Sequence, residues 1–409
     1  MTSKLSPSVA IVVPSFDRGG LEQVALNLYR GYRALGSRCI VLVERNEAGY
    51  MLGRLERPGD GIILNGDESL FVEALARHEI DVVHYHYSTF GLAAARRLGL
   101  FTLYTVHNVY TWLDDAGFAH HAGQIMEADR VVAVSRFVRD YFCRRAQVPM
   151  DQVDVIPNGI DLSWIAGAGA GTLPDLDIPA GRFVFVLPAS YFPVKHHPLA
   201  LRAAELLLSR RKDFHLVFVG NVGDEGYAVD VDTLVAASPA RTHVSQVACL
   251  SHDQMAAVYQ QLADCVVLPT IQEGCSNVVL EALAFDRSLI ITDVGNAAEA
   301  RALSPRVRVI DRAEEIDALT PDRIEALSRT GDCRNLRALV DAMASAMTVR
   351  GGDAGEAELV ERREAIGLNR MVDGYHRLFR SAAPLALGAA PQAWAIPAAS
   401  PSKTAETLA

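Results

Sequence analysis

Several features that would place this chain in a familiar class are missing from its sequence. No apolar run approaches the 18 or so residues that a membrane-spanning helix needs, and Val9–Val13 is too short for the core of a signal peptide. The six cysteines are scattered without a CxxC pair, which is typical of reduced thiols rather than of disulfides. A net charge of −10 argues against nucleic acid as the main partner, but it allows the protein a local basic patch that contacts a membrane surface. These features predict a cytoplasmic protein, soluble or peripheral at the inner face of the membrane.

The sequence also lacks a complete metal-binding pattern. Two Asp-x-Asp segments start at Asp175 and Asp230, but they fall in a linker and in a helical stretch rather than at the end of a strand. We interpret them as solvated acids. His84 and His86 share one face of an expected strand, which alternation produces by default, and no third ligand lies nearby in the sequence. We therefore predict no metal and no cofactor.

What the chain does contain is enough hydrophobic sequence for two domains. Half of its 409 residues are hydrophobic and 22% are charged, and single cores rarely grow past about 250–300 residues. Short apolar runs alternate with helical patterns, which predicts an α/β fold with parallel sheets covered on both faces. The expected strands are 8–13, 39–43, 62–64, 81–84, 103–106 and 130–134 in the first half, and 182–187, 215–219, 243–248, 263–268, 288–292 and 307–310 in the second. The predicted divisions are a domain at 1–165, a linker at 166–180, a domain at 181–350, a terminal helix at 356–383 and a disordered tail at 384–409.

The most informative stretch runs from residue 269 to residue 283. A short strand ends before Pro269, a loop follows, and Ser276 or Asn277 can cap a helix that begins at once. Backbone N–H groups and the helix dipole make such a place an anion site. Glu273 and Glu281 flank it and can accept hydrogen bonds from hydroxyls on either side of a diphosphate, as a nucleotide sugar offers. A capped surface helix that carries two glutamates is the alternative.

Glu-Gly-Cys-Ser-Asn-Val-Val-Leu-Glu, with seven residues between its glutamates, resembles the signature of the retaining GT-B glycosyltransferases of family 4, the glycosyl transferases group 1. The likeness spans nearly the whole chain. It implies two facing Rossmann-like domains with a cleft between them, an acceptor side in the first and a nucleotide-sugar side in the second. It also implies that the terminal helix crosses back onto the first domain.

The resemblance assigns roles to particular residues. The first glutamate lies against the donor sugar and the second holds the ribose, a histidine touches the sugar, and a lysine neutralises the departing diphosphate. The expected catalytic residues are His107, Lys195 and Glu273. The expected donor-binding residues are Gly19, Gly20, Ser190, Gly274, Ser276, Asn277, Val278 and Glu281, and the acceptor-side candidates are Asn108, Tyr110 and Trp112.

Each of these assignments has a plainer alternative. Gly19 and Gly20 fit a tight turn and lack the full GxGxxG pattern, and Lys195 fits a solvated surface lysine. His107 fits a histidine satisfied by neighbouring backbone, and the aromatics of the following loop can pin that loop to the core. The chain also departs from the family at two places. Ala189-Ser190 replaces the usual Gly-Arg, which removes one cation from the leaving group, and Phe285-Asp286 replaces a small residue and glycine.

The predicted function is that of a retaining, metal-independent hexosyltransferase. Its donor would be a UDP-, GDP- or ADP-linked sugar, and its acceptor a hydroxyl of a sugar or a lipid-linked molecule in cell-surface polysaccharide or glycolipid synthesis. The alternatives are another GT-B activity, namely a nucleotide-sugar epimerase or a phosphorylase, and a nucleotide-sugar-binding protein without turnover. The sequence leaves the base, the sugar, the acceptor and the oligomeric state open.

Overall fold

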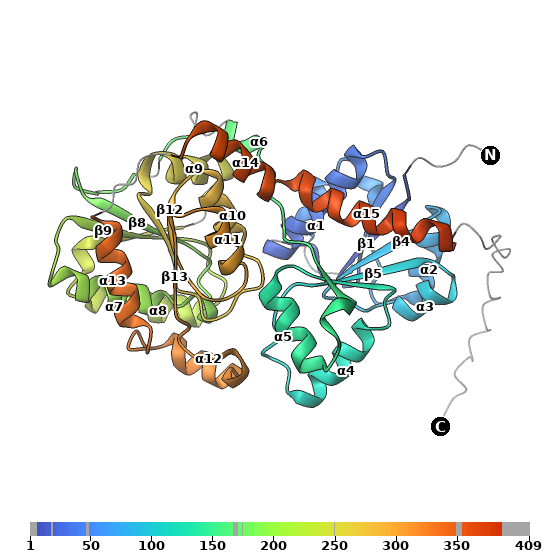
Figure 1. Ribbon diagram of the computed structural model, residues 1–409, viewed down its shortest axis with the longest axis horizontal. Coiled ribbons are helices and arrows are strands. Elements are labelled where there is room, and N and C mark those ends of the chain that lie inside the picture. Colours follow the sequence, from blue (N-terminus) through green and yellow to red (C-terminus); the bar gives the residue numbers. More distant parts are fainter. Residues whose placement is uncertain are drawn as a thin grey trace, which may run out of the picture.

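The computed structural model describes residues 6–386 apart from 18, 46–48, 167–170, 174, 249 and 349–353, and it leaves the side chains of 166 and 382–386 aside. Two α/β domains lie side by side, each built on its own sheet (Figure 1). The predicted pair of parallel-sheet domains is confirmed. Part of the predicted linker and nearly all of the predicted tail lie outside the described residues.

The first domain is built on a seven-stranded sheet in which all neighbouring strands run parallel, in the order β3-β2-β1-β4-β5-β6-β7. The strands are β1 Val9–Val13, β2 Cys39–Val43, β3 Gly61–Ile63, β4 Val82–His86, β5 Phe101–Val106, β6 Arg130–Ala133 and β7 Val153–Val155. The helices are α1 Gly20–Ala34, α2 Glu68–Arg77, α3 Leu92–Arg97, α4 Asp115–Ile125 and α5 Arg136–Ala146.

The second domain has a six-stranded parallel sheet in the order β10-β9-β8-β11-β12-β13. The strands are β8 Phe183–Pro188, β9 Phe214–Val219, β10 Val244–Val247, β11 Cys265–Leu268, β12 Ser288–Thr292 and β13 Val307–Ile310. The helices from the crossing onward are α6 Ser163–Ala166, α7 His197–Leu208, α8 Glu225–Ala237, α9 His252–Ala257, α10 Asn277–Ala284, α11 Ala297–Leu303, α12 Pro321–Ser328, α13 Leu336–Ala346, α14 Glu356–Ile366 and α15 Leu368–Ala386.

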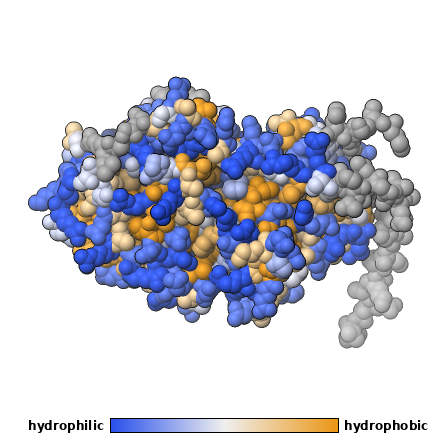
Figure 2. Space-filling view, in the orientation of Figure 1, coloured by the Kyte–Doolittle hydropathy of each residue, from blue (hydrophilic) through white to orange (hydrophobic). Residues whose placement is uncertain are grey.

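The central strands are apolar on both faces because helices cover each sheet from both sides. Every residue of β1, β8, β9 and β11 is buried, as a parallel sheet requires. Polar side chains cover most of the face seen in Figure 2, and hydrophobic ones gather toward the middle of the molecule. Within the described chain, no helix combines the length and the hydropathy needed to cross a bilayer.

The sequence-based strands are wrong at two places. The strand β7 is not predicted, because it has only three residues and a Pro-Asn-Gly turn begins one residue after it. His84, expected at the end of its strand, lies inside β4, which continues to His86.

The terminal helix is two helices rather than one. Gly367 is extended between α14 and α15, with φ −70° and ψ 154°, and it pairs with Ile160 of the segment that leaves the first domain. The Leu368 N–H donates to the Ile160 carbonyl at 2.8 Å. A Cβ on Gly159 would lie 2.7 Å from the Gly367 carbonyl oxygen, so glycine lets the two chain crossings between the domains touch. From this point α15 runs over the first domain beside α1 (Figure 1).

Asp286 anchors α14 to the end of α10. It has φ +53°, the left-handed conformation that usually favours glycine and that Asp tolerates. Its carboxylate accepts hydrogen bonds from Arg362 and Arg306 and, at 2.9 Å, from the Ala354 N–H. Although burial opposes the charge, these bonds hold the pKa of Asp286 below its usual value. The departure from glycine therefore has a structural role.

Replacing Asp286 with Asn should cost about 3–5 kcal/mol of unfolding free energy, because it removes the buried countercharge of the Arg362 guanidinium and leaves only the half-exposed Glu358 carboxylate. Asn keeps the size of the side chain and tolerates the left-handed conformation. The matched control is Glu358→Gln, which removes the exposed carboxylate on the same arginine and should cost less than about 1 kcal/mol. Urea denaturation measures both, and equal losses would contradict a buried role for Asp286.

Candidate functional site at the carboxyl ends of the two sheets

The loop after β11 meets the loop after β5 where the carboxyl ends of the two sheets face each other. A Cβ built on Gly274 would lie 1.8 Å from the His107 carbonyl oxygen, so backbone touches backbone at this point. Ligands of doubly wound sheets collect at the carboxyl ends of the strands. The fold thus brings the predicted residues His107, Glu273 and Gly274 together.

Three hydrogen bonds surround this contact and join the two domains. Ser135 Oγ donates to the Gly274 carbonyl at 2.8 Å, and the same hydroxyl accepts from the Val138 N–H as the cap of α5. Asn158 Nδ2 donates to the Cys275 carbonyl at 3.2 Å. The third bond runs from the Thr111 hydroxyl to the Gln272 side-chain oxygen. Local sequence patterns carry no signal for these bonds between domains.

Lys195 and Glu273 form an ion pair within the second domain, with Nζ 2.6 Å from Oε2. About a quarter of the lysine side chain and a fifth of the glutamate side chain are exposed. Their loops are fixed to each other because the Thr270 hydroxyl and the Ile271 N–H both donate to the Val194 carbonyl at 2.8 Å. Lys195 is therefore held at the site rather than extended into solvent.

The helix α10 begins beside this ion pair without a side-chain cap. Ser276 occupies the N-cap position, but neither its hydroxyl nor the Asn277 side chain caps the helix, contrary to the sequence prediction. The Ser276 backbone is instead held by Asn296, whose Oδ1 accepts from its N–H at 3.0 Å and whose Nδ2 donates to its carbonyl at 3.3 Å. Val278 lies in the first turn. Uncapped N–H groups and the helix dipole leave this end suited to an anion.

Glu281 lies one turn further along α10. Its Oε2 accepts a hydrogen bond from the Tyr259 hydroxyl at 2.7 Å. Burial raises the pKa of Glu281, while this hydrogen bond acts in the opposite direction. Tyr259 belongs to a π-helical turn, Val258–Leu262, a rare conformation that often occurs at functional sites.

His107 is almost buried, and its partner is another histidine rather than backbone. Its Nε2 lies 2.7 Å from Nδ1 of His86. Burial lowers the pKa of His107 to about 3, and burial followed by the neighbouring imidazoles lowers that of His86. His107 is therefore neutral near pH 7, and its uncharged imidazole can donate one hydrogen bond and accept another. Within the described residues, no group of three or more His, Cys, Asp or Glu side chains could hold a metal ion.

The aromatic side chains of the loop after His107 have different environments. Tyr110 is 1% exposed and pins the loop to the core of the first domain, whereas Trp112 is 48% exposed. The Asn108 side chain accepts from the Val109 N–H at 2.8 Å. Tyr87, which the sequence did not single out, stacks on His107 with ring centroids 5.5 Å apart. Its φ of +58° is unusual for a bulky residue, and such conformations cluster at functional sites.

The other predicted donor-binding residues lie around this centre. Gly19 and Gly20 stand at the start of α1, and a Cβ on Gly19 would meet the Glu22 carboxylate at 2.2 Å. Burial is the main cause that raises the pKa of Tyr87, Tyr110 is the next, and the carboxylates of Glu273 and Glu22 add smaller contributions. Ser190 follows β8 in the loop that leads to Lys195.

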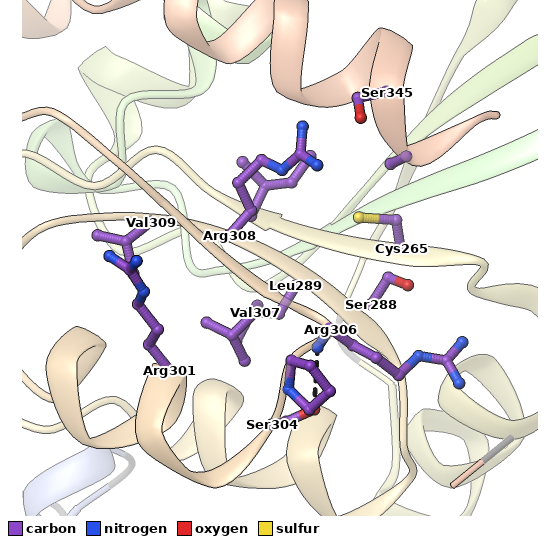
Figure 3. Close-up of a pocket in the computed structure, with 13 residues that line it drawn as sticks. Cys265, Ser288, Leu289, Arg301, Ser304, Arg306, Val307, Arg308, Val309 and Ser345 are labelled. Carbon is purple, nitrogen blue, oxygen red and sulfur yellow. Dashed lines mark hydrogen bonds between the residues drawn. The ribbon is translucent and has the colours of Figure 1, made fainter. Parts of the chain in front are cut away.

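A separate pocket of about 680 Å³ lies at the other end of the second sheet, at the amino ends of β11, β12 and β13. Figure 3 shows Arg301, Arg306 and Arg308 around it, with guanidinium groups that point in different directions. Because this edge faces away from the carboxyl ends of the strands, we do not assign the predicted site to this pocket.

Two family models match this chain. The model of Glycosyltransferase Family 4 matches residues 18–164, and that of Glycosyl transferases group 1 matches residues 173–321. Among curated proteins, the D-inositol 3-phosphate glycosyltransferase of Arthrobacter sp. is 27% identical over 237 residues, and that of Rhodococcus jostii 26% over 284. These alignments cover 54% and 62% of this chain, and only 56% and 62% of the relatives.

Solved structures show the same fold at low identity. A glycosyltransferase from Rickettsia africae superposes with a TM-score of 0.73 at 17% identity, covering 92% of this chain and 98% of its own. Anabaena HepE, crystallised with UDP and glucose, gives 0.67 at 14% identity, covering 92% and 100%. Sucrose-phosphate synthase from Thermosynechococcus elongatus gives 0.68 at 16% identity, covering 93% and 100%.

Gly274→Ala should separate the two domains at this contact without unfolding either, because its Cβ cannot share the space of the His107 carbonyl. Small-angle scattering should show a larger radius of gyration, with an unchanged circular dichroism spectrum. The control is Gly226→Ala, whose Cβ would meet Asp224 only at an ordinary 3.5 Å. An unchanged scattering profile for Gly274→Ala would show that the loop adapts locally.

Proposed function

The chain belongs to the group 1 glycosyltransferases, and from this membership we propose that it transfers a hexose from a nucleotide diphosphate sugar to a hydroxyl acceptor with retention of configuration. The observation that carries the proposal is the meeting of Lys195, Glu273 and the uncapped start of α10 beside His107. Together they offer a cation, a carboxylate, an anion-binding helix end and a neutral imidazole around one point.

The cationic groups suit a departing diphosphate. Lys195 and the N-terminus of α10 would compensate the negative charge that builds on the leaving group as the glycosidic bond breaks. We propose that they do so without a divalent metal. Lys195 is paired with Glu273, so the diphosphate must replace this carboxylate as its partner.

The remaining groups suit the sugar and the ribose. Glu273, displaced from Lys195, would lie against the hexose and stabilise the positive charge that develops at its anomeric carbon. His107 would orient the sugar through a hydrogen bond, and Glu281 would accept from the ribose hydroxyls. A diphosphate oxygen would take the acceptor proton on the face from which the leaving group departs. The exposed Trp112 is the candidate to stack on the acceptor.

The base, the sugar and the acceptor can be approached in a defined order. Anabaena HepE, which shares the fold, was crystallised with UDP-glucose, so UDP-glucose is the first donor to test, followed by the GDP and ADP equivalents. The curated relatives are named for D-inositol 3-phosphate, so that polyol phosphate is a reasonable first acceptor beside sugars and lipid-linked sugars. A place in cell-surface polysaccharide or glycolipid synthesis belongs to the same proposal.

The direct test combines nucleotide binding with transfer. At least one of UDP, GDP and ADP should raise the melting temperature by the same amount in EDTA as in magnesium, and its hexose conjugate should support transfer with retained configuration. Loss of binding on chelation, restored by magnesium, would contradict the metal-independent site.

One observation favours a second candidate, a nucleotide-sugar-binding protein without turnover. Ser190 stands where the family signature usually has an arginine ahead of the lysine, so one cation on the leaving group is missing. Intact nucleotide binding with neither transfer nor donor hydrolysis would support this alternative over the enzyme.

Substitutions of Glu281 and Glu273 should have different effects on the steady-state kinetics. Glu281→Ala should raise the donor KM about ten- to a hundredfold with a smaller loss of kcat, because ribose contacts change little in the transition state and a hydrogen bond to a charged group contributes about 1.5–3 kcal/mol. Glu273→Ala should lower kcat at least about a hundredfold, because its carboxylate acts on charge that develops only in the transition state. Its donor KM should stay constant or fall, since Lys195 loses a competing partner.

Steady-state kinetics measures kcat and the donor KM of the two variants, with Glu358→Gln on the outer face of α14 as the control. If Glu281→Ala proves to be the kcat variant and Glu273→Ala the KM variant, the two roles are reversed. If neither variant changes the kinetics, the stretch from residue 269 to residue 283 has no role in catalysis.

A further inference from the structure

The buried side of Glu281 is occupied by a tyrosine that no part of the expected site includes. The Tyr259 hydroxyl donates to Glu281 Oε2 at 2.7 Å, and the tyrosine is completely buried. One carboxylate oxygen therefore faces the interior with a fixed partner. Among the described residues, no donor lies within hydrogen-bonding distance of the other oxygen, Oε1.

The Tyr259 ring is held in place by aromatic neighbours from two other elements. Phe285, at the end of α10, stacks on it with centroids 5.4 Å apart and an angle of 14°. Trp164 of α6 packs against both rings at 6.4 and 5.2 Å. Phe285 is one of the two positions at which this chain departs from its family, and its ring fills the space against Tyr259.

The backbone at Tyr259 also helps to fix the position of its side chain. The helix α9 ends at Ala257 and continues as the π-helical turn Val258–Leu262. A π-turn inserts one residue into the helical register and rotates the side chains that follow. Such a turn is less stable than a regular helical turn, so the surrounding structure must stabilise it. Here it places the Tyr259 hydroxyl within hydrogen-bonding distance of the Glu281 carboxylate.

We propose that Tyr259 is a positioning residue, whose hydroxyl fixes one oxygen of Glu281 so that the other is presented to the vicinal hydroxyls of a nucleotide ribose. This inference rests on the proposed function for its ligand, although the contact itself does not. A carboxylate that accepts from Tyr259 on one oxygen keeps lone pairs on the other for a 2′- and a 3′-hydroxyl.

The same hydrogen bond favours the ionised form of Glu281. Burial favours the neutral acid and the Tyr259 hydroxyl favours the carboxylate. The charged side chains that face α10 from α11 and α14 have partners of their own: Glu299 pairs with Arg136, Arg362 with Asp286 and Glu358, and Arg363 with the Ala284 carbonyl. Removing the tyrosine hydroxyl should therefore raise the pKa of Glu281. When the pH is lowered, the carboxylate of the variant should become protonated at a higher pH than that of the wild type.

The test compares Tyr259→Phe with Tyr227→Phe in the full chain. Tyr227 is another buried tyrosine, whose hydroxyl accepts from the His197 N–H, away from Glu281. In the ligand-free proteins, carbon-13 NMR of labelled glutamate follows the Glu281 carboxyl, with Glu281→Gln to assign its signal. Tyr259→Phe should move its titration to higher pH, and Tyr227→Phe should leave it in place. An unmoved titration in Tyr259→Phe overturns the proposal.

The second measurement tests whether the contribution of Tyr259 to binding depends on the ribose hydroxyls. We expect Tyr259→Phe to weaken binding of UDP about tenfold at pH 7, with a steeper loss toward pH 5, and to leave 2′,3′-dideoxy-UDP unaffected. Equal losses for both nucleotides would show a structural role and overturn the proposal. If UDP does not bind the wild-type chain, GDP and ADP with their dideoxy forms take its place.

The two proposals fail in different ways. A wild-type chain that binds none of the three nucleotides refutes the proposed function and the ribose contact with it. A chain that binds a nucleotide, yet discriminates equally against its dideoxy form with and without the Tyr259 hydroxyl, refutes the positioning role alone.

Discussion

The arrangement of the site depends on one steric constraint, the contact of the Gly274 backbone with the His107 carbonyl. A side chain at position 274 would occupy the space of that oxygen, so only glycine allows the loops from the two sheets to meet. The Ser135, Asn158 and Thr111 hydrogen bonds all lie around this contact. Because the loop after β11 also carries Glu273 and leads into α10, the same contact sets where the first domain lies relative to the proposed donor.

Lys195, Glu273 and Glu281 each have a hydrogen-bond partner within the protein in this state. Lys195 pairs with Glu273, and Glu281 accepts from Tyr259. This follows from the cost of burying charged groups without partners. A nucleotide diphosphate sugar would therefore bind by exchanging partners, taking Lys195 from Glu273 while Glu281 keeps Tyr259. The first exchange would free Glu273 at the moment when the diphosphate arrives, which couples the binding of the leaving group to the placement of the carboxylate beside the sugar.

Departures from the family have different consequences in different parts of the molecule. Asp286 takes a left-handed position that glycine usually fills and uses its carboxylate to bind Arg306 and Arg362, which ties α14 to α10. Phe285 stacks on Tyr259. Both support α10 from its carboxyl end. Ser190 is different, because it lies in the loop of Lys195 and supplies no positive charge to the proposed leaving group.

The sequence by itself determined the parallel α/β fold of both halves, because strand-length apolar runs that alternate with amphipathic helices allow few other structures. It also determined the loop and helix from 269 to 283, whose small residues and spaced glutamates are local features. The tertiary structure alone decided what these residues contact. The Lys195–Glu273 pair, the His86–His107 pair and the Tyr259–Glu281 bond join residues 78, 21 and 22 positions apart, and local pattern carries no information on such contacts. For the same reason Ser276 could be recognised as an N-cap position but not as an uncapped one: Asn296, twenty residues away, holds its backbone, and that leaves the start of α10 to a ligand.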